Sequence, residues 1–175
     1  VFMGYRMPPQ GTKDAYALEM LTKVLSDGQS SRMYKTIVDE KQLGIAVQAF
    51  PYSLEMGGIL INLGIVNAGV SLDTLVEAIE MEIERIKDEQ ISEREYTKVL
   101  NQLENDFVAS NARMAGIAEN LANYQVYFGD ADLINTEIEK YREITAEDIQ
   151  QVAQKYLQDE NRVVLYYLPK EGDEQ

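Results

Sequence analysis

Apolar and polar side chains alternate in four stretches of the chain, and this period of two predicts β-strands. The expected strands cover residues 1–7, 45–54, 59–66 and 162–168. Pro8 and Pro9 end the first strand, because proline has no N–H to donate to a strand pair. The segment from Glu55 to Gly58, between the second and third strands, is typical of a hairpin connection.

The two middle strands carry different side chains on their two faces. In the second strand, Ile45, Val47 and Ala49 are expected to share one face. In the third strand, the alternating apolar residues share a face, whereas Asn62 and Gly64 lie on the opposite one. A glycine here indicates either a close approach by a neighbouring element or a crowded contact, and the sequence leaves both open.

Apolar residues elsewhere recur at steps of three and four, which predicts amphipathic helices. Thr12 or Asp14 can cap the first helix, and Ser92-x-x-Glu95 and Thr145-x-x-Asp148 are capping boxes that begin two later ones. The expected helices cover residues 12–27, 33–44, 71–88, 92–107, 113–128, 132–142 and 146–156.

One stretch, from Asp27 to Ile45, joins a helix end, a short helix and a strand. Asp27 and Gly28 form the turn that ends the first helix. We expect the short helix to stop at Gly44, because glycine adopts the left-handed backbone of a helix end without a steric penalty. This joint would set the angle between the helices and the sheet.

The helices do not alternate regularly with the strands, which argues against a doubly wound parallel sheet. The order favours an α+β fold, with an antiparallel or mixed sheet and a helical layer on one face. The chain has 175 residues, of which 45% are hydrophobic, enough for one core. We therefore expect residues 1–175 to form a single α+β domain.

Composition excludes several kinds of function. A net charge of −14 repels phosphate backbones, so no nucleic-acid partner is expected. No apolar run or basic amphipathic helix indicates a membrane partner. The chain has no histidine and no cysteine, which rules out Ser-His-Asp and Cys-His machinery within it and makes a zinc site unusual.

A few residues could carry chemistry, but a structural role is favoured for each. The row Glu77, Glu80, Glu82 and Glu84 could be imagined as a metal site, yet a solvated helix face explains it better. Arg32 could bind an anion, but an ion pair with Asp27 or Glu40, or a role at a helix end, is the favoured use. Composition and pattern alone thus indicate an acidic α+β domain without its own catalytic centre.

Four segments, in order, resemble blocks of one known family. They are DAYALEMLTKVLSDGQSSRMYKTIVDEKQLGIAVQAF, PYSLEMGGILINLGI, NAGVSLDTLVEAIEMEIERIKDEQISEREYTKVLNQLENDFV and TAEDIQQVAQKYLQDENRVVLYYLPKEG. The chain resembles the C-terminal, non-catalytic domain of the insulinase/pitrilysin family of inverted zinc metallopeptidases, which includes mitochondrial processing peptidase. The resemblance implies the metallohydrolase fold of that enzyme.

In this family a catalytic domain carries H-x-x-E-H on its first helix, where two histidines and a distant glutamate bind zinc. The resemblance places Tyr16 and Met20 at the histidine positions and Glu19 at that of the water-activating glutamate. The distant glutamate would fall near Asn101 or Gln102. The resemblance therefore implies no metal site, catalytic residue or cofactor in this chain, and zinc in a sibling domain or subunit.

Many non-catalytic domains of the family hold substrate with an arginine and, seven residues on, a tyrosine. Val38 and Ile45 occupy those positions here. Neither residue is kept, so the substrate-binding residues stay unknown. Two alternatives stay open: the domain supports the chamber wall rather than facing the scissile bond, or it comes from a protein whose peptidase activity is weak or absent.

The favoured hypothesis is a non-catalytic domain of a zinc metallopeptidase that encloses a peptide together with a homologous zinc-bearing domain. The alternative is a structural subunit of the core-protein type, without a proteolytic role; a small acidic binding module acting alone is a weaker third. Because Val1 begins in mid-strand, we expect a fragment of a longer multi-domain protein, itself a zinc metalloendopeptidase, although this chain alone would be inactive. A water-soluble chain is expected, with bacterial periplasm and cytoplasm both left open.

Overall fold

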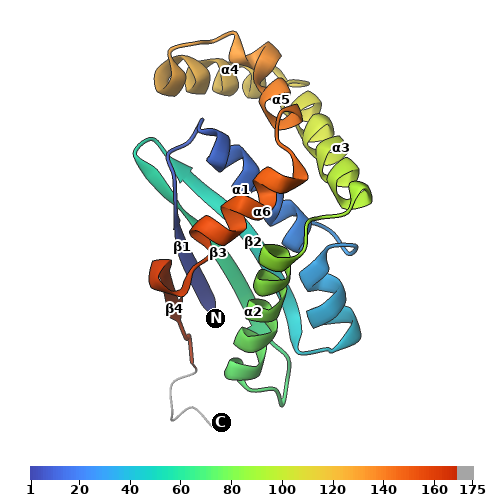
Figure 1. Ribbon diagram of the computed structural model, residues 1–175. Coiled ribbons are helices and arrows are strands. Elements are labelled where there is room, and N and C mark those ends of the chain that lie inside the picture. Colours follow the sequence, from blue (N-terminus) through green and yellow to red (C-terminus); the bar gives the residue numbers. More distant parts are fainter. Residues whose placement is uncertain (169–175) are drawn as a thin grey trace.

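A computed structural model of the chain, described here for residues 1–168, contains a four-stranded sheet in the order β2-β3-β1-β4 (Figure 1). All of its strand pairs are antiparallel. The strands are β1 (Phe2–Met7), β2 (Gly44–Leu54), β3 (Gly57–Val66) and β4 (Arg162–Leu165). The β2–β3 connection is the expected hairpin, and β4 is shorter than predicted. The acidic tail after Pro169 lies outside the described residues.

Helices cover one face of this sheet, as Figure 1 shows for α1, α2 and α6, while α3, α4 and α5 continue beyond its end. The α-helices are α1 (Lys13–Ser26), α2 (Leu72–Asp88), α3 (Glu93–Ser110), α4 (Met114–Asn123), α5 (Leu133–Arg142) and α6 (Ala146–Tyr156). Two π-helical segments, η1 (Tyr34–Glu40) and η2 (Tyr124–Phe128), and a 3₁₀ turn, η3 (Asp159–Asn161), complete the chain. This arrangement confirms the predicted α+β class. No helix within residues 1–168 is long and apolar enough to cross a membrane.

The N-caps predicted from the sequence are present at the starts of the helices. Thr12 caps α1, and both predicted capping boxes form, at Ser92 with Glu95 and at Thr145 with Asp148. Each box satisfies backbone N–H groups that have no partner inside the helix. The sequence therefore placed these helix starts correctly because the signal is local.

The core lies between the sheet and α1, which is buried along most of its length. The residues of β1 that alternate inward, Met3, Tyr5 and Met7, are almost fully buried. Gly64 marks the closest approach of α2, because a Cβ there would lie 3.0 Å from Leu75 Cδ2 and 3.1 Å from Ile79 Cδ1. A side chain at this position would push α2 away from the sheet, which settles one alternative that the sequence left open.

The predicted helix stop at Gly44 is wrong. The left-handed residue between η1 and β2 is Gln42, with φ of 51°, while Gly44 already belongs to the strand. A Cβ at Gly44 would meet Ile65 O at 3.1 Å and Leu75 Cδ1 at 3.3 Å. Glycine is therefore suited to this position by crowding between β3 and α2, not by the backbone angle of a helix end.

The expected grouping of Ile45 with Val47 and Ala49 is also wrong. The β2–β3 register shifts between Gly44 and Ala46, so Ile45 is the extra residue of a β-bulge. Ile45 is 61% exposed, whereas Val47 and Ala49 are buried. The bulge reverses the inside–outside alternation, and a simple period of two cannot anticipate it.

Arg32 pairs with a residue that the sequence did not indicate. Its Nε donates to Glu95 Oε1 at 2.7 Å and its Nη2 to Glu95 Oε2 at 3.1 Å, instead of pairing with Asp27 or Glu40. Burial alone would raise the pKa of Glu95, but hydrogen bonds from Arg32 and Ser92 outweigh burial and lower that pKa to about 2. One carboxylate thus caps α3 and ties it to the segment before η1.

The sequence predicted a solvated Glu-rich face on α2, but part of this face is buried. Glu82 is only 4% exposed, and one of its carboxylate oxygens has no hydrogen-bond partner within residues 1–168. Glu80 forms an ion pair with Arg162 at the start of β4. These carboxylates are therefore spread over different environments and do not converge.

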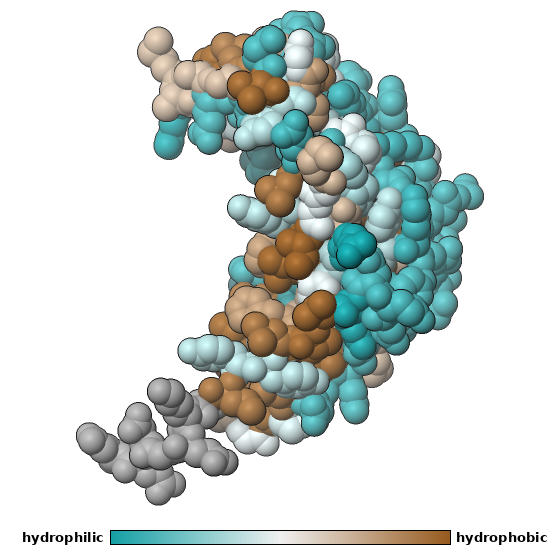
Figure 2. Space-filling view, turned by 90° about the vertical axis from the view of Figure 1, so that its left-hand side faces the viewer, coloured by the Kyte–Doolittle hydropathy of each residue, from teal (hydrophilic) through white to brown (hydrophobic). Residues whose placement is uncertain are grey.

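The face of the sheet opposite the helices is apolar and carries no helix among the described residues. Paired strands align Phe50 with Ile61, Ile61 with Gly4, and Gly4 with Val163 across it. Val163 is 72% exposed and Tyr52 59%. The large apolar side chains of this face that count as exposed include Phe2, Phe50, Tyr52, Leu54, Ile59, Ile65, Val163 and Leu165. Figure 2 shows apolar residues gathered along the concave left-hand side and hydrophilic ones on the opposite side.

Asn62 on the inner face of β3 gives a test of this packing. It is fully buried, and neither its amide nitrogen nor its amide oxygen has a hydrogen-bond partner in the described part of the chain. An unpaired buried polar group costs about 1–3 kcal/mol, so Asn62→Leu should raise the free energy of unfolding by a comparable amount. Urea denaturation measures it, with Asn105→Leu on the exposed face of α3 as the control. A loss of stability in Asn62→Leu alone would contradict this account.

Candidate functional site

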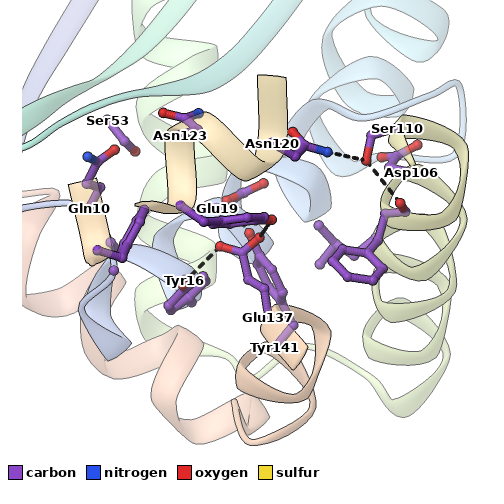
Figure 3. A pocket seen from close by; sticks show the side chains of 16 residues that line it. Gln10, Tyr16, Glu19, Ser53, Asp106, Ser110, Asn120, Asn123, Glu137 and Tyr141 are labelled. Atoms are coloured by element: carbon purple, nitrogen blue, oxygen red, sulfur yellow. Dashed lines mark hydrogen bonds between the residues drawn. The ribbon is translucent and has the colours of Figure 1, made fainter. Parts of the chain in front are cut away.

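A pocket of about 380 Å³ opens where α1 meets α3, η2 and α5 (Figure 3). Its polar centre consists of two glutamates and three tyrosines drawn from three separate segments. These five residues, here called the Glu–Tyr cluster, are Tyr16 and Glu19 of α1, Tyr124 of η2, and Glu137 and Tyr141 of α5.

Each carboxylate of the Glu–Tyr cluster accepts hydrogen bonds from tyrosine hydroxyls. Tyr16 Oη donates to Glu137 Oε1 at 3.0 Å, and Tyr124 Oη donates to Glu137 Oε2. Tyr141 Oη donates to Glu19 Oε2 at 2.7 Å. The rings of Tyr16 and Tyr141 meet edge to face with centroids 4.8 Å apart, which fixes both hydroxyls.

The surroundings of the cluster disfavour negative charge. Burial raises the pKa of Glu19, and the nearby Glu137 and Asp106 add to that rise, against the lowering effect of Tyr141 and Lys23. Burial and the neighbouring carboxylates also raise the pKa of Tyr16, Tyr124 and Tyr141. The three hydroxyls therefore keep their protons and act as donors.

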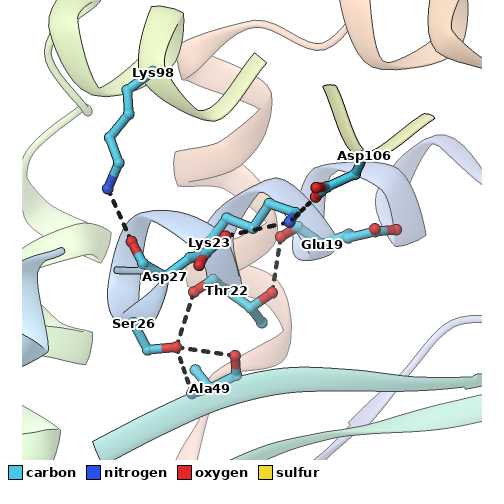
Figure 4. Close-up of polar contacts among 8 residues, drawn as sticks. All are labelled: Glu19, Thr22, Lys23, Ser26, Asp27, Ala49, Lys98 and Asp106. Carbon is cyan, nitrogen blue, oxygen red and sulfur yellow. Dashed lines mark hydrogen bonds and ion pairs between the residues drawn. The ribbon is translucent and has the colours of Figure 1, made fainter. Parts of the chain in front are cut away.

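A second hollow continues from Glu19 along α1 to the edge strand β2, and is lined also by Lys23, Ser26 and Phe50. Figure 4 shows its polar contacts. Lys23 Nζ bonds Asp106 at 2.9 Å and Asp27 at 3.3 Å, so it is already paired with carboxylates other than Glu19. Glu19 lines both hollows, which therefore adjoin at this residue and are here together called the groove.

The outer edge of β2 beside this groove is blocked. Ser26 Oγ accepts from Ala49 N at 2.6 Å and lies 3.1 Å from Ala49 O, so it occupies the groups that another strand would need. Pro51, two residues along the same strand, has no N–H to offer. β2 is an edge strand within residues 1–168, yet it is not an open template for strand addition.

The positions that the resemblance assigned to a zinc site do not fit the metal. Tyr16 and Glu19 lie together in the pocket, but Met20 is fully buried in the core and does not line it. Asn101 and Gln102, near the expected place of the distant glutamate, line a different hollow with Lys98. No group of three or more potential ligands gathers anywhere within residues 1–168. Phenol, thioether and amide groups leave zinc without the nitrogen and sulfur ligands it prefers.

The two positions that the resemblance aligned with a substrate-holding pair lie apart from the pocket lining. Val38 belongs to η1 and packs against the core, while Ile45 projects from the bulge of β2. Neither side chain can donate a hydrogen bond to a peptide.

Sequence reasoning missed three members of the cluster: Tyr124, Glu137 and Tyr141. Glu137 and Tyr141 are four residues apart, which places them on one helix face, and this spacing was the available signal. Their meeting with Tyr16 and Glu19 spans more than a hundred residues of chain. Only tertiary packing brings them together.

The geometry of the site thus combines an antiparallel sheet backed by helices with the absence of a metal-ligand cluster in residues 1–168. Residues 1–103 match the family described as the Peptidase M16 inactive domain. The chain therefore belongs to the M16 peptidase family, as an inactive domain, and the resemblance stated from the sequence is confirmed.

Known proteins that are similar to this chain are named proteases or peptidase domains. The zinc protease PqqE of Helicobacter pylori is 26% identical over 171 residues, which cover 97% of this chain and 38% of that protein. A protease from Helicobacter pylori has the same fold, with a TM-score of 0.84 at 23% identity, over 92% of this chain and 38% of that one. The inactive peptidase domain of a Bordetella parapertussis protein assigned as a zinc protease gives 0.85 at 21% identity, over 98% of this chain and 93% of that one.

The raised pKa of Glu19 predicts how stability depends on pH. A carboxyl group whose pKa is higher in the folded than in the unfolded protein opposes folding once it ionises. The resulting loss of stability begins above about pH 4.5, the ordinary pKa of glutamate, and increases until the pH reaches the pKa of the group in the folded protein. Glu19→Gln should therefore raise the free energy of unfolding at pH 7, by about 1.4 kcal/mol for each unit of the rise.

The gain should vanish at about pH 4 and below, where Glu19 is protonated in both states. Denaturation of both proteins across this range measures the difference. Glu77→Gln, which removes an exposed carboxylate from α2, controls for the loss of one charge. Equal stability of Glu19→Gln and the parent at pH 7 would contradict the assignment.

Proposed function

We propose that this chain is the non-catalytic domain of a zinc metallopeptidase, and that it encloses a peptide substrate together with a zinc-bearing sibling domain. The observation that carries the proposal is the uncovered apolar face of the sheet. Soluble domains rarely leave so large a contiguous apolar surface open unless another protein surface covers it.

A homologous domain is the occupant that best suits this face. Its centre is apolar, and few charged residues lie on it apart from Arg6 of β1. Association of two such faces gains mainly from burial of apolar area, at roughly 25 cal/mol per Å². The exposed apolar side chains of the α4–η2 region, including Met114 and Val126, would extend the contact at the end of the molecule.

Family membership supports zinc in the partner rather than in this chain. The curated relative is named a zinc protease, and the chain spans 38% of its length. The motif positions Tyr16 and Met20 carry no zinc ligand, so the proposed peptidase would hold its metal in the sibling domain. Glu19 would then have no role in activating water.

The blocked edge of β2 limits how this domain would meet a peptide. Strand addition needs free N–H and C=O groups, and Ser26 and Pro51 remove them at the middle of the strand. Val38 and Ile45 would contribute shape but no hydrogen bond. We infer that side-chain contacts in the groove, rather than a shared backbone ladder, would provide this domain's part of the enclosure.

The first test is association with the zinc-bearing domain, produced separately from the same genome. Sedimentation velocity should show a stable complex with this chain. Phe50→Glu, which places a charge on the open sheet face, should weaken the association by about tenfold or more, because a buried unpaired charge is costly. Met81→Glu makes a matched change on the exposed surface of α2 and should have no effect. Equal losses from both variants, or no complex with the parent chain, would refute the proposed interface.

The second test concerns the metal. Elemental analysis of the purified chain should find zinc well below one equivalent, and peptides should stay intact on incubation with it. Mixing with the zinc-bearing domain should restore cleavage. Stoichiometric zinc in the chain alone would overturn the proposal, and a complex that binds zinc but never cleaves would favour the structural-subunit alternative.

A further inference from the structure

We propose that the pocket around the Glu–Tyr cluster binds a cationic side-chain group, the guanidinium or ammonium of a basic residue in an extended peptide. The two carboxylates would receive the cation, and the tyrosine rings would form its walls. The proposal rests on the proposed function for the peptide, while the pocket itself consists wholly of residues of this chain.

The first support is a pair of carboxyl groups without a cationic partner. Glu19 and Glu137 are both partly buried, yet neither forms an ion pair among residues 1–168. Their hydrogen-bond donors are neutral hydroxyls of tyrosines. Carboxyl groups withdrawn from solvent are normally paired with a cation or a metal, so a cationic group is the partner that this pocket can accept.

Two lysines lie close to the cluster, and neither forms an ion pair with Glu19 or Glu137. Lys23 is held by Asp27 and Asp106. Lys140 lies over the ring of Tyr16, with Nζ 5.7 Å from the ring centroid, outside the hydrogen-bonded centre. Among the described residues, no lysine or arginine side chain therefore occupies the centre of the pocket as an ion-pair partner of Glu19 or Glu137.

The second support is the aromatic wall. Tyr16, Tyr124 and Tyr141 contact the carboxylates, and Phe107 and Phe128 are also part of the lining. Faces of aromatic rings attract ammonium and guanidinium groups, and the position of Lys140 over Tyr16 shows one such contact within this chain. An anion would instead meet Glu19, Glu137 and Asp106 together, so anionic ligands are disfavoured.

The third support is the shape of the site. A volume of about 380 Å³ falls within the range of pockets that accept small organic groups. Glu19 also belongs to the hollow that runs along α1 beside β2, so a peptide lying in that hollow could place one side chain in the pocket. A metal ion is a poorer occupant, because no three ligating groups converge in residues 1–168.

Agmatine, a guanidinium compound small enough to enter the pocket, provides the direct test with the 175-residue chain. Isothermal titration calorimetry should detect one binding site. Glu137→Gln and Glu19→Gln should each weaken binding by about tenfold, since each removes a charge-assisted contact while keeping an oxygen acceptor for the tyrosines. Glu77→Gln is the matched control and should bind agmatine as the parent does. No binding to the parent chain, or equal weakening by Glu77→Gln, would overturn the proposal.

A second arm separates a peptide side chain from a free amine. An extended peptide with one central arginine should bind more tightly than agmatine, and the same peptide with citrulline should lose most of that affinity. If agmatine binds but the arginine peptide does not, the ligand is a free cation and the peptide part is refuted. Association with the zinc-bearing domain is measured independently of either ligand, so failure of the pocket and failure of the proposed function give different results.

Discussion

The enclosure of α1 is the constraint on which the rest of the structure depends. This helix packs against β2 on one side and against α3, α5 and α6 on the others, so that nine of its residues are buried. A helix covered this completely can keep polar side chains only where a neighbouring element supplies partners. The Glu–Tyr cluster is the set of partners that makes Glu19 and Tyr16 tolerable there.

The same constraint separates neighbouring side chains of α1 by what they face. Met20 lies in the apolar core, while Tyr16 and Glu19 face α5 and bond to Glu137 and Tyr141. The side of α1 that meets α5 is therefore polar, and its chemistry is that of hydroxyl donors and carboxylate acceptors.

Much of the fold could be predicted because its signals are local. Caps at Thr12, Ser92 and Thr145 and the hairpin before Gly57 depend on residues close in sequence, and all appear as expected. The bulge at Ile45 depends on how β2 pairs with β3, and the partner of Arg32 lies 63 residues away. Those features are decided by tertiary packing, which no local pattern contains.

The candidate site, too, could be predicted from the sequence only in part. The resemblance placed Tyr16 and Glu19 on the first helix, but nothing in the sequence of that helix indicates that Tyr124, Glu137 and Tyr141 are their neighbours.

The pairing of Phe2 in β1 with Leu165 in β4 has a further consequence, for biosynthesis. The sheet cannot be completed until Leu165 has left the ribosome, and until then one side of β1 remains without its partner β4. Such long-range closure slows folding and lengthens the period in which nascent chains can aggregate or recruit chaperones.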